Sequence, residues 1–186
     1  MEYAKQLLIS ALALFTSACQ TGVLAWNEEA KLSDNSIILT TRTVAFKYFQ
    51  PIGGGGGAEI TNSSLKIASG ANAPHHIWSH PPLIPLLLDK DANSNEWLIV
   101  ATFLDCETWE KLGRPKLPYI EFRYRKNNWQ QTPLSPSLIG KQTNLIMPDR
   151  KRASQDQTIE SKSEIERKAN TLPEFRQISS KWVNNC

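Results

Sequence analysis

The chain has 186 residues, of which 40% are hydrophobic and 21% are charged, and its formal net charge is +3 at pH 7. This composition fits an ordinary globular chain that is long enough to bury a core. The net charge is mild and the basic residues are mostly scattered, so the sequence predicts no binding to nucleic acid.

The first 18 residues have the layout of a secretory signal peptide. Lys5 precedes an uncharged and mostly apolar stretch, Leu7–Ala18, which is shorter than the roughly 20 apolar residues that span a bilayer. The tetrapeptide Thr16-Ser17-Ala18-Cys19 resembles the lipobox of bacterial lipoproteins, although Thr16 stands where leucine is usual. The pattern favours acylation of Cys19 over simple secretion, which Thr16 and Ala18 also suit, and it disfavours a buried N-terminal helix.

The lipobox resemblance also implies a location. Gln20 follows Cys19, and in lipoproteins of the enterobacterial type a residue other than aspartate at this position implies sorting to the outer membrane. Acyl chains such as palmitate would anchor the protein without a transmembrane helix, because each buried methylene contributes about 0.8 kcal/mol. We therefore expect an outer-membrane lipoprotein that faces the periplasm, with a soluble periplasmic protein as the alternative.

The chain has three cysteines. If Cys19 carries the lipid, Cys106 and Cys186 remain, and an exported protein is expected to pair them in a disulfide. This bridge would close a loop of about 80 residues and could add roughly 4 kcal/mol to stability, less any strain. The alternative is two separate thiols.

Downstream of the signal peptide the sequence first predicts β structure. "SIILTTRTVAFKYF" is rich in β-branched and aromatic residues and "SDNS" predicts a turn, so we expect a hairpin of residues 26–32 and 37–49. The glycines at 53–57 lack the Lys-Ser/Thr of a P-loop and the spacing of a dinucleotide fingerprint, and they are interpreted as a flexible hairpin loop. A strand is expected at residues 58–69.

The middle of the chain predicts further strands. "NAPHHIWSHPP" (residues 72–82) is interpreted as a proline-bounded loop, and residues 83–105 as two core segments around a polar turn. "WLIVATF" (residues 97–103) is the best candidate for a central strand buried on both faces. A connection follows at residues 106–118, and "PYIEFRYRKNNWQQTPL" (residues 118–134) predicts a hairpin.

The expected fold is a single mainly β domain, an antiparallel sandwich or partly open barrel with a short C-terminal helix. From about Pro148 the sequence becomes polar, and Ser163 with Glu166 is interpreted as a capping box that starts this helix, which runs through Ala169. The expected division is a signal peptide (1–18), a β domain (19–147), a polar linker with the short helix (148–170) and a C-terminal segment that packs back on the domain (171–186).

Two stretches carry a resemblance to known proteins. "AWNEEAKLSDNSIIL" (residues 25–39) and "GRPKLPYIEFRYRKNNWQQTPL" (residues 113–134) resemble small exported proteins and lipoproteins of proteobacteria. The shared features are a Trp-x-Glu-Glu start, a Gly-Arg-Pro…Pro-Tyr hinge and an aromatic hairpin. The resemblance supplies no catalytic residues. Some small exported lipoproteins of this kind are immunity proteins against secreted antibacterial effectors, so the resemblance implies that function.

His75, His76 and His80 form the only cluster of metal-ligand residue types in the sequence. His76 and His80 would share one face of a helix, as a zinc site on a helix requires, but prolines flank the stretch and no His-Glu-x-x-His motif is present. The sequence therefore favours a surface loop over a metal or catalytic site, and we expect no cofactor. An envelope metal-binding protein or hydrolase that uses this loop is the alternative function.

Trp109 and Arg114, in the connection after the central strand, are the main candidate contacts for a protein partner, and Trp78 forms a weaker second patch. Tryptophan and arginine are enriched at binding hot spots, and nearby prolines lower the entropy lost on docking. The alternative is that Trp109 plugs the core. The sequence thus favours a non-catalytic domain that binds another protein, such as a toxin or effector, over an enzyme.

Replacing the predicted lipid-acceptor cysteine tests the anchor. Cys19→Ser should release the protein from membranes and abolish fatty-acid labelling, because serine offers no thiol for acylation. The measurements are fractionation of the cell envelope and metabolic labelling with a fatty acid. Labelling that persists in Cys19→Ser would contradict the lipobox interpretation.

Overall fold

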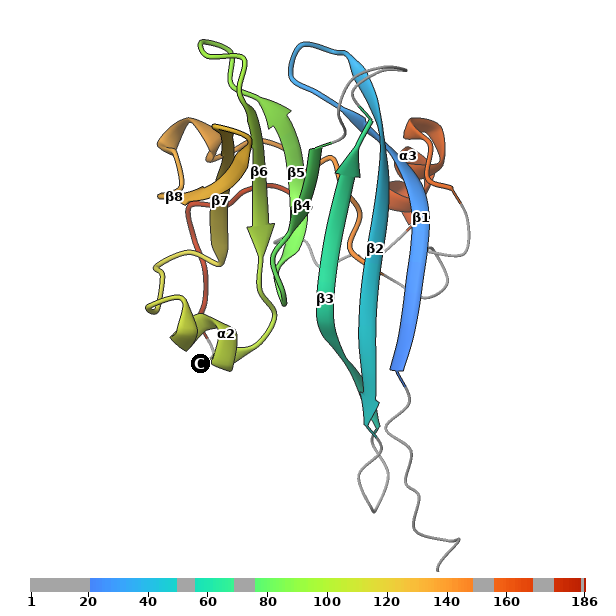
Figure 1. Cartoon of the computed structure of the whole chain (residues 1–186), viewed down its shortest axis with the longest axis vertical. Coiled ribbons are helices and arrows are strands. Elements are labelled where there is room, and N and C mark those ends of the chain that lie inside the picture. Colours follow the sequence, from blue (N-terminus) through green and yellow to red (C-terminus); the bar gives the residue numbers. More distant parts are fainter. Residues whose placement is uncertain (1–20, 50–55, 69–75, 149–155, 169–175, 185) are drawn as a thin grey trace, which may run out of the picture.

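The computed structural model describes residues 21–49, 56–68, 76–148, 156–168, 176–184 and 186. Figure 1 shows two antiparallel four-stranded sheets in these residues. The first sheet contains, in chain order, β1 (Thr21–Lys31), β2 (Ile37–Phe49), β3 (Gly57–Ile67) and β4 (His76–Ser79). The second sheet contains β5 (Ile84–Lys90), β6 (Trp97–Thr102), β7 (Tyr119–Arg125) and β8 (Asn128–Thr132). The predicted signal peptide, Cys19, His75 and most of the glycine run lie outside the described residues.

The helices of the described residues are short: α2 (Cys106–Lys111), the 3-10 helix η2 (Pro136–Leu138) and α3 (Ile159–Lys168). None of the helices in the described ranges has both the length and the apolar character needed to cross a bilayer. The predicted fold class, a mainly β antiparallel domain with a short C-terminal helix, is confirmed.

The first hairpin shows how local chemistry sets the sheet. Burial alternates along β1 and β2, so that Trp26, Ala30 and Val44 face the interior and their neighbours face outward. At the turn, the Asp34 carboxylate accepts the Ser36 backbone N–H at 2.8 Å, and Asn35 adopts a φ of 68°. This turn is the one that "SDNS" predicts.

β6 is the central strand that the sequence predicts. Its residues Ile99 and Ala101 join the core between the two sheets, whereas Leu98 and Val100 join a second apolar cluster on the outer face of the second sheet. Loop residues cover this outer cluster, among them Leu138 of η2 and Ile178 near the C-terminus. Burial of β6 on both faces is therefore confirmed, and the second sheet lies between the core and the outer apolar cluster.

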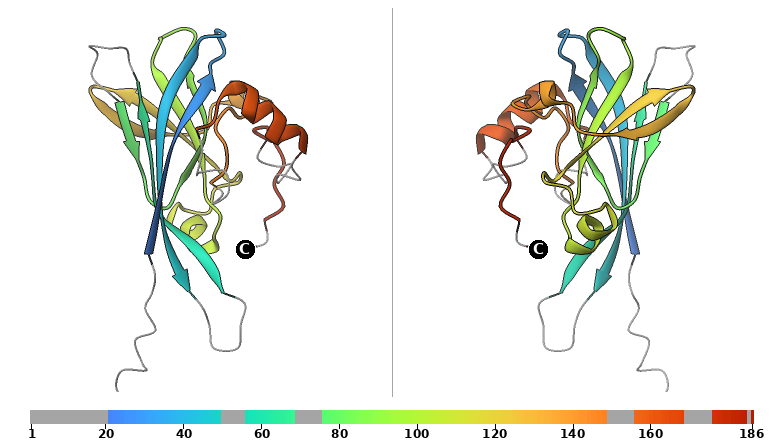
Figure 2. Two further views of the ribbon diagram at one scale, coloured as in Figure 1. Left: turned by 90° about the vertical axis from the view of Figure 1, so that its right-hand side faces the viewer. Right: turned by 90° about the vertical axis from the view of Figure 1, so that its left-hand side faces the viewer.

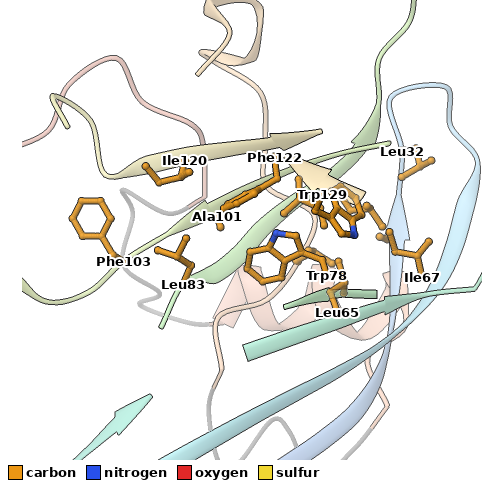
Figure 3. Packing of buried hydrophobic residues seen from close by; sticks show 14 residues of the cluster. Leu32, Leu65, Ile67, Trp78, Leu83, Ala101, Phe103, Ile120, Phe122 and Trp129 are labelled. Carbon is orange, nitrogen blue, oxygen red and sulfur yellow. The ribbon is translucent and has the colours of Figure 1, made fainter. Parts of the chain in front are cut away.

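The core between the sheets is rich in aromatic side chains. Trp78 of β4 is fully buried and meets Phe122 of β7 edge to face, with ring centres 5.5 Å apart. Trp129 of β8 and Leu65 of β3 line the same core (Figure 3). Truncating a buried aromatic side chain of this kind typically costs about 3–5 kcal/mol, so this packing is a major source of stability.

One seam between the sheets is closed by side chains. The Asn144 amide accepts the Leu88 N–H of β5 at 2.9 Å and donates to the carbonyl oxygens of Leu88 at 2.7 Å and of Lys31 at 2.9 Å. Close by, the buried Asp89 carboxylate accepts hydrogen bonds from Lys141 Nζ at 2.8 Å and from the hydroxyl and N–H of Ser33. Burial raises the pKa of Asp89, but these hydrogen bonds outweigh burial and lower that pKa below its ordinary value.

A buried ion cluster joins β1, β2 and α3. Glu28 and Arg42 are both fully buried and pair at 3.0 Å, and Lys162 of α3 reaches the other Glu28 oxygen at 2.8 Å. Lys162 Nζ also donates to the backbone carbonyl oxygens of Glu29, at 2.7 Å, and of Asn144. The part of the chain that the sequence analysis assigns to a polar linker therefore contributes a buried charge to the packed domain.

The Arg42 guanidinium lies between the carboxylate and an aromatic ring. Burial lowers the pKa of Arg42, and the charge and hydrogen bond of Glu28 oppose that shift. The guanidinium carbon is 5.2 Å from the ring centre of Trp26, within the range of a cation–π contact. Its Nε and Nη2 atoms have no hydrogen-bond partner among the described residues. The buried charge thus depends on Glu28 for its ion pair and on Trp26 for a cation–π contact.

α3 begins earlier than the capping box predicts. It starts at Ile159 rather than Ser163, and the Thr158 hydroxyl accepts the Ser161 N–H at 3.1 Å. The Glu29 side chain of β1 accepts the Ile159 N–H at 2.9 Å. The helix start is therefore set by Thr158 and by a contact from β1, 130 residues away in the sequence.

Removing the charge of Glu28 tests the buried cluster. Glu28→Gln should lower the free energy of unfolding by about 3–5 kcal/mol, because Arg42 and Lys162 would then be buried without a counter-charge. Urea denaturation of the disulfide-intact protein measures this loss. The matched control is Glu107→Gln, which removes a pair with Lys111 whose side chains are 75% and 70% exposed and should leave stability unchanged. A Glu28→Gln protein as stable as the control would show that the cluster contributes nothing net.

Candidate functional site

The candidate site is built on α2, which follows β6. The sequence predicts only a connection at residues 106–118, and the helix at Cys106–Lys111 corrects that prediction. Asp105 is its N-cap: one carboxylate oxygen accepts the Thr108 N–H at 2.7 Å and the other accepts the Thr108 hydroxyl at 2.8 Å. Glu107 in the first turn and Lys111 in the last turn complement the helix dipole. The aspartate three residues before a threonine was the available sequence signal for this helix.

Trp109 is fixed on α2 by contacts on both sides. Its indole N–H donates to the Pro115 carbonyl at 3.1 Å, and its ring meets that of Trp182 edge to face at 6.4 Å. The chain turns back after the helix through Gly113, with a φ of 78°, and Arg114, with a φ of 59°. Trp109 is therefore half-buried, with a structural role toward Trp182 and an open part toward solvent.

Arg114 completes the surface that the sequence predicts. Its guanidinium carbon lies 5.5 Å from the ring centre of Trp109, and its Nη2 donates to Glu110 at 3.1 Å. The Arg114 side chain is 65% exposed. The structure thus brings the two main candidate contact residues together on one exposed surface.

The C-terminal segment supports the same surface. Cys106, the first residue of α2, lies at disulfide distance from Cys186, with 5.4 Å between their Cα atoms. Trp182, in the C-terminal segment that the sequence predicts to pack back on the domain, packs on Phe103 at 5.8 Å as well as on Trp109. We use the name α2 platform for the partly exposed surface formed by Trp109 and Arg114.

The histidine segment differs from its prediction. Residues His76–Ser79 form strand β4 rather than a surface loop, because they pair with residues 64–67 of β3. His76 and His80 point toward the second sheet, where their rings lie 4.3 Å from Tyr124 and from Phe122. Trp78 is fully buried between them, so its assignment to an exposed partner-binding patch was wrong.

The two described histidines are used in aromatic packing. Desolvation lowers the pKa of both His76 and His80 below the ordinary value of 6.5. Within the ranges that the structure describes, no group of three or more His, Cys, Asp or Glu side chains lies close enough to hold a metal ion. His75 lies outside those ranges.

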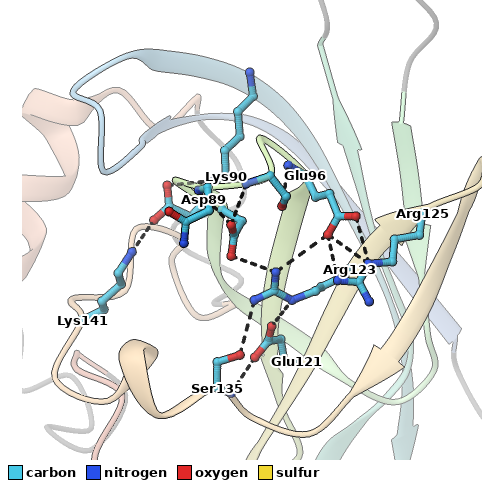
Figure 4. Close-up of polar contacts among 11 residues, drawn as sticks. Asp89, Lys90, Glu96, Glu121, Arg123, Arg125, Ser135 and Lys141 are labelled. Carbon is cyan, nitrogen blue, oxygen red and sulfur yellow. Dashed lines mark hydrogen bonds and ion pairs between the residues drawn. The ribbon is translucent and has the colours of Figure 1, made fainter.

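A second polar cluster lies on the outer face of the second sheet (Figure 4). Glu121 is fully buried, and its two oxygens accept Arg123 Nε at 2.6 Å and the Ser135 N–H at 2.7 Å. Arg123 also pairs with Asp91 at 2.9 Å. The N–H of Ser94 and the Arg123 hydrogen bond hold the pKa of Asp91 well below its ordinary range. Both carboxylates are held by fixed hydrogen-bond partners, which suits a structural brace between β7 and the β5–β6 loop better than proton transfer.

Comparisons with protein-family models, with curated proteins and with solved structures found no match to this chain. Its function is therefore argued from the α2 platform and from the strand edges of the fold.

The two half-buried histidines, His76 and His80, predict a pH dependence of stability. A histidine whose folded pKa is lowered binds its proton more tightly when unfolded, so its contribution is complete above about pH 6.5 and declines as the pH falls below that value. In NMR titrations the imidazole signals of His76 and His80 should have midpoints below 6.5. Unfolding free energy should fall between pH 7 and pH 5.5, and His80→Gln should reduce that slope. Midpoints at or above 6.5 would contradict this.

Proposed function

We propose that the chain is a lipid-anchored, periplasm-facing, non-catalytic binding protein of the immunity type, which binds and neutralises a secreted antibacterial effector. The observation that carries the proposal is the α2 platform. It presents a partly exposed tryptophan with an arginine stacked on it, on a helix whose ends are fixed. Tryptophan and arginine are the residues most often found at the centre of protein–protein hot spots.

The platform is suited to docking because little of it must become ordered. Asp105 caps the helix, and Pro115 holds the Trp109 indole N–H through its carbonyl. Leu104 precedes the N-cap residue Asp105 in sequence and Val183 follows Trp182, and both side chains are exposed. Binding groups that are already in place lose less conformational entropy on association, which favours affinity.

The positive charge of Arg114 gives the platform a preference for a partner that carries a carboxylate. Its internal ion pair with Glu110 is solvent-exposed, with side-chain exposures of 65% and 59%, and exposed pairs of this kind contribute little. A carboxylate of the partner could bind the same planar guanidinium with two parallel hydrogen bonds. The surface therefore fits an acidic side chain next to an apolar one.

The proposed anchor would place this surface close to a membrane. β1 begins at Thr21, two residues after Cys19. Figure 1 shows α2 toward the same end of the molecule as the start of β1. An effector bound by the α2 platform would then be held at the membrane surface, where a protein entering the periplasm arrives.

A growth assay tests the proposal. Each secreted protein encoded next to this chain is exported to the periplasm of a laboratory strain, and growth is measured with and without the chain. The full-length chain should restore growth against one toxic neighbour, and Arg114→Ala should lose protection because its binding weakens by about 2 kcal/mol or more.

The control for Arg114→Ala is Lys111→Ala. Lys111 is equally exposed on α2 and also pairs with a glutamate four residues earlier, but the cation over the Trp109 ring is Arg114. Arg114 has a positive φ, and alanine, like arginine, has a β-carbon, so Arg114→Ala adds no new backbone strain. Lys111 is exposed on α2, so we expect both variants to fold. Absence of protection by the parent chain, or equal protection by Arg114→Ala, would overturn the proposal.

A further inference from the structure

The two sides of the sandwich are closed differently. On one side Asn144 and its neighbours bridge β1 to β5, and the backbone of Gln157 exchanges hydrogen bonds with Asn27 and Glu29 of β1. On the other side lie β4 and β8, away from α3 (Figure 2). Within the described residues, β4 pairs with β3 and β8 pairs with β7, and neither has a second neighbouring strand. The outer edge of β8 is thus unpaired in that part of the chain.

The register of the β7–β8 hairpin defines which backbone groups this edge presents. Lys126 and Asn127 form a two-residue turn with φ values of 50° and 60°, as a type I′ turn requires. In such a hairpin the residues flanking the turn form a hydrogen-bonded pair, and hydrogen-bonded pairs then alternate along the ladder. Asn128, Gln130 and Thr132 therefore bond to β7, whereas the N–H and C=O groups of Trp129 and Gln131 point away from it.

β8 is a short strand of five residues, and it lacks two of the usual protections of an edge strand, charged side chains and a bulge. Its sequence, Asn128–Thr132, contains no charged residue, and proline occurs only after its end, at Pro133. Natural edge strands are commonly guarded by inward-pointing charges, prolines or bulges against pairing with another chain. An unguarded edge with outward donors and acceptors is a template for strand addition.

We propose that β8 is a docking edge that binds an extended segment of the protein partner as an added strand. This inference rests on the proposed function, which supplies the partner, and it names the chemistry recognised: a polypeptide backbone in extended conformation. Hydrogen bonds from Trp129 and Gln131 hold the segment, and the α2 platform provides side-chain contacts elsewhere on the second sheet. A second copy of this chain is the competing occupant.

The test uses proline at the outward-facing position. Gln131→Pro removes an N–H that points away from β7, so it should block strand addition without breaking the β7–β8 ladder. Gln131→Ala keeps that N–H and is the matched control for the side chain. The probe is the blocked hexapeptide Thr-Val-Thr-Val-Thr-Val, titrated into the exported chain carrying Cys19→Ser and followed by NMR.

Three results are expected. In the unbound protein the amides of Trp129 and Gln131 exchange with solvent quickly while that of Gln130 is protected. The hexapeptide protects Trp129 and Gln131. Gln131→Pro weakens peptide binding about tenfold or more, which corresponds to the loss of one hydrogen bond, while Gln131→Ala binds like the parent chain.

Three results would overturn the proposal. Protection of the Gln131 amide in the unbound, monomeric protein would show that the chain itself covers the edge. Equal peptide binding by Gln131→Pro, or none by the parent chain, would show that β8 does not accept a strand. A concentration-dependent dimer that Gln131→Pro abolishes would assign the edge to a second copy. Because the peptide assay uses no effector, its failure is distinguishable from failure of the growth assay.

Discussion

The hydrogen bonds of Asn144 are the contacts on which the arrangement of the two sheets depends. Its side chain joins the carbonyl of Lys31 on β1 to the backbone of Leu88 on β5, and its own carbonyl accepts Lys162 of α3. Each four-stranded sheet is complete in chain order, so its ladder does not fix where the other sheet lies. The backbone groups of Leu88 are buried, and a buried polar group that loses its partner costs about 1–3 kcal/mol, so loss of the Asn144 amide would destabilise this junction.

The two sides of the sandwich are held together by different interactions. On the α3 side, buried ions are paired: Glu28 with Arg42 and Lys162, and Asp89 with Lys141. On the β4 and β8 side, cohesion comes from aromatic contacts such as that between His76 and Tyr124. Ion pairs and amide hydrogen bonds occupy the polar groups on the α3 side. Ring packing on the other side uses side chains only and leaves the outer backbone groups of β8 without a strand partner among the described residues. The open side is therefore the one on which another polypeptide can be accommodated with the least disruption.

Much of the fold could be predicted from the sequence because its signals are local. The "SDNS" turn, the apolar run of β6 and the Lys126-Asn127 turn each depend on neighbouring residues, and the structure confirms them. What could not be predicted depends on distant contacts. Polar residues such as Glu28 and Lys162 are expected to be exposed from their type alone, yet both are buried and are paired with charges from other elements.

The candidate site divides in the same way. Trp109 and Arg114 could be singled out because a tryptophan and an arginine stand close together in a proline-bearing segment, and the structure brings them into contact. Trp78 was misjudged because its flanking prolines suggest a loop, whereas its pairing with Leu65 places it in a strand that faces the core. The β8 edge has no composition signal of its own. Whether β8 is an edge strand depends on the order of all strands in its sheet, and that order is not encoded in the residues of β8 alone.

The α2 platform and the β8 edge are both connected to strand β7. The loop that carries Arg114 leads directly into β7, and β7 leads through a two-residue turn into β8. β7 itself is held by β6 on one side and by the Glu121–Arg123 brace on its outer face. A partner that contacts both surfaces would therefore bind a preformed, rigid unit, and its second contact would add to affinity without a further ordering cost. On the proposed function, the second sheet carries the recognition surfaces, the first sheet follows the anchor proposed at Cys19, and both sheets contribute to the core.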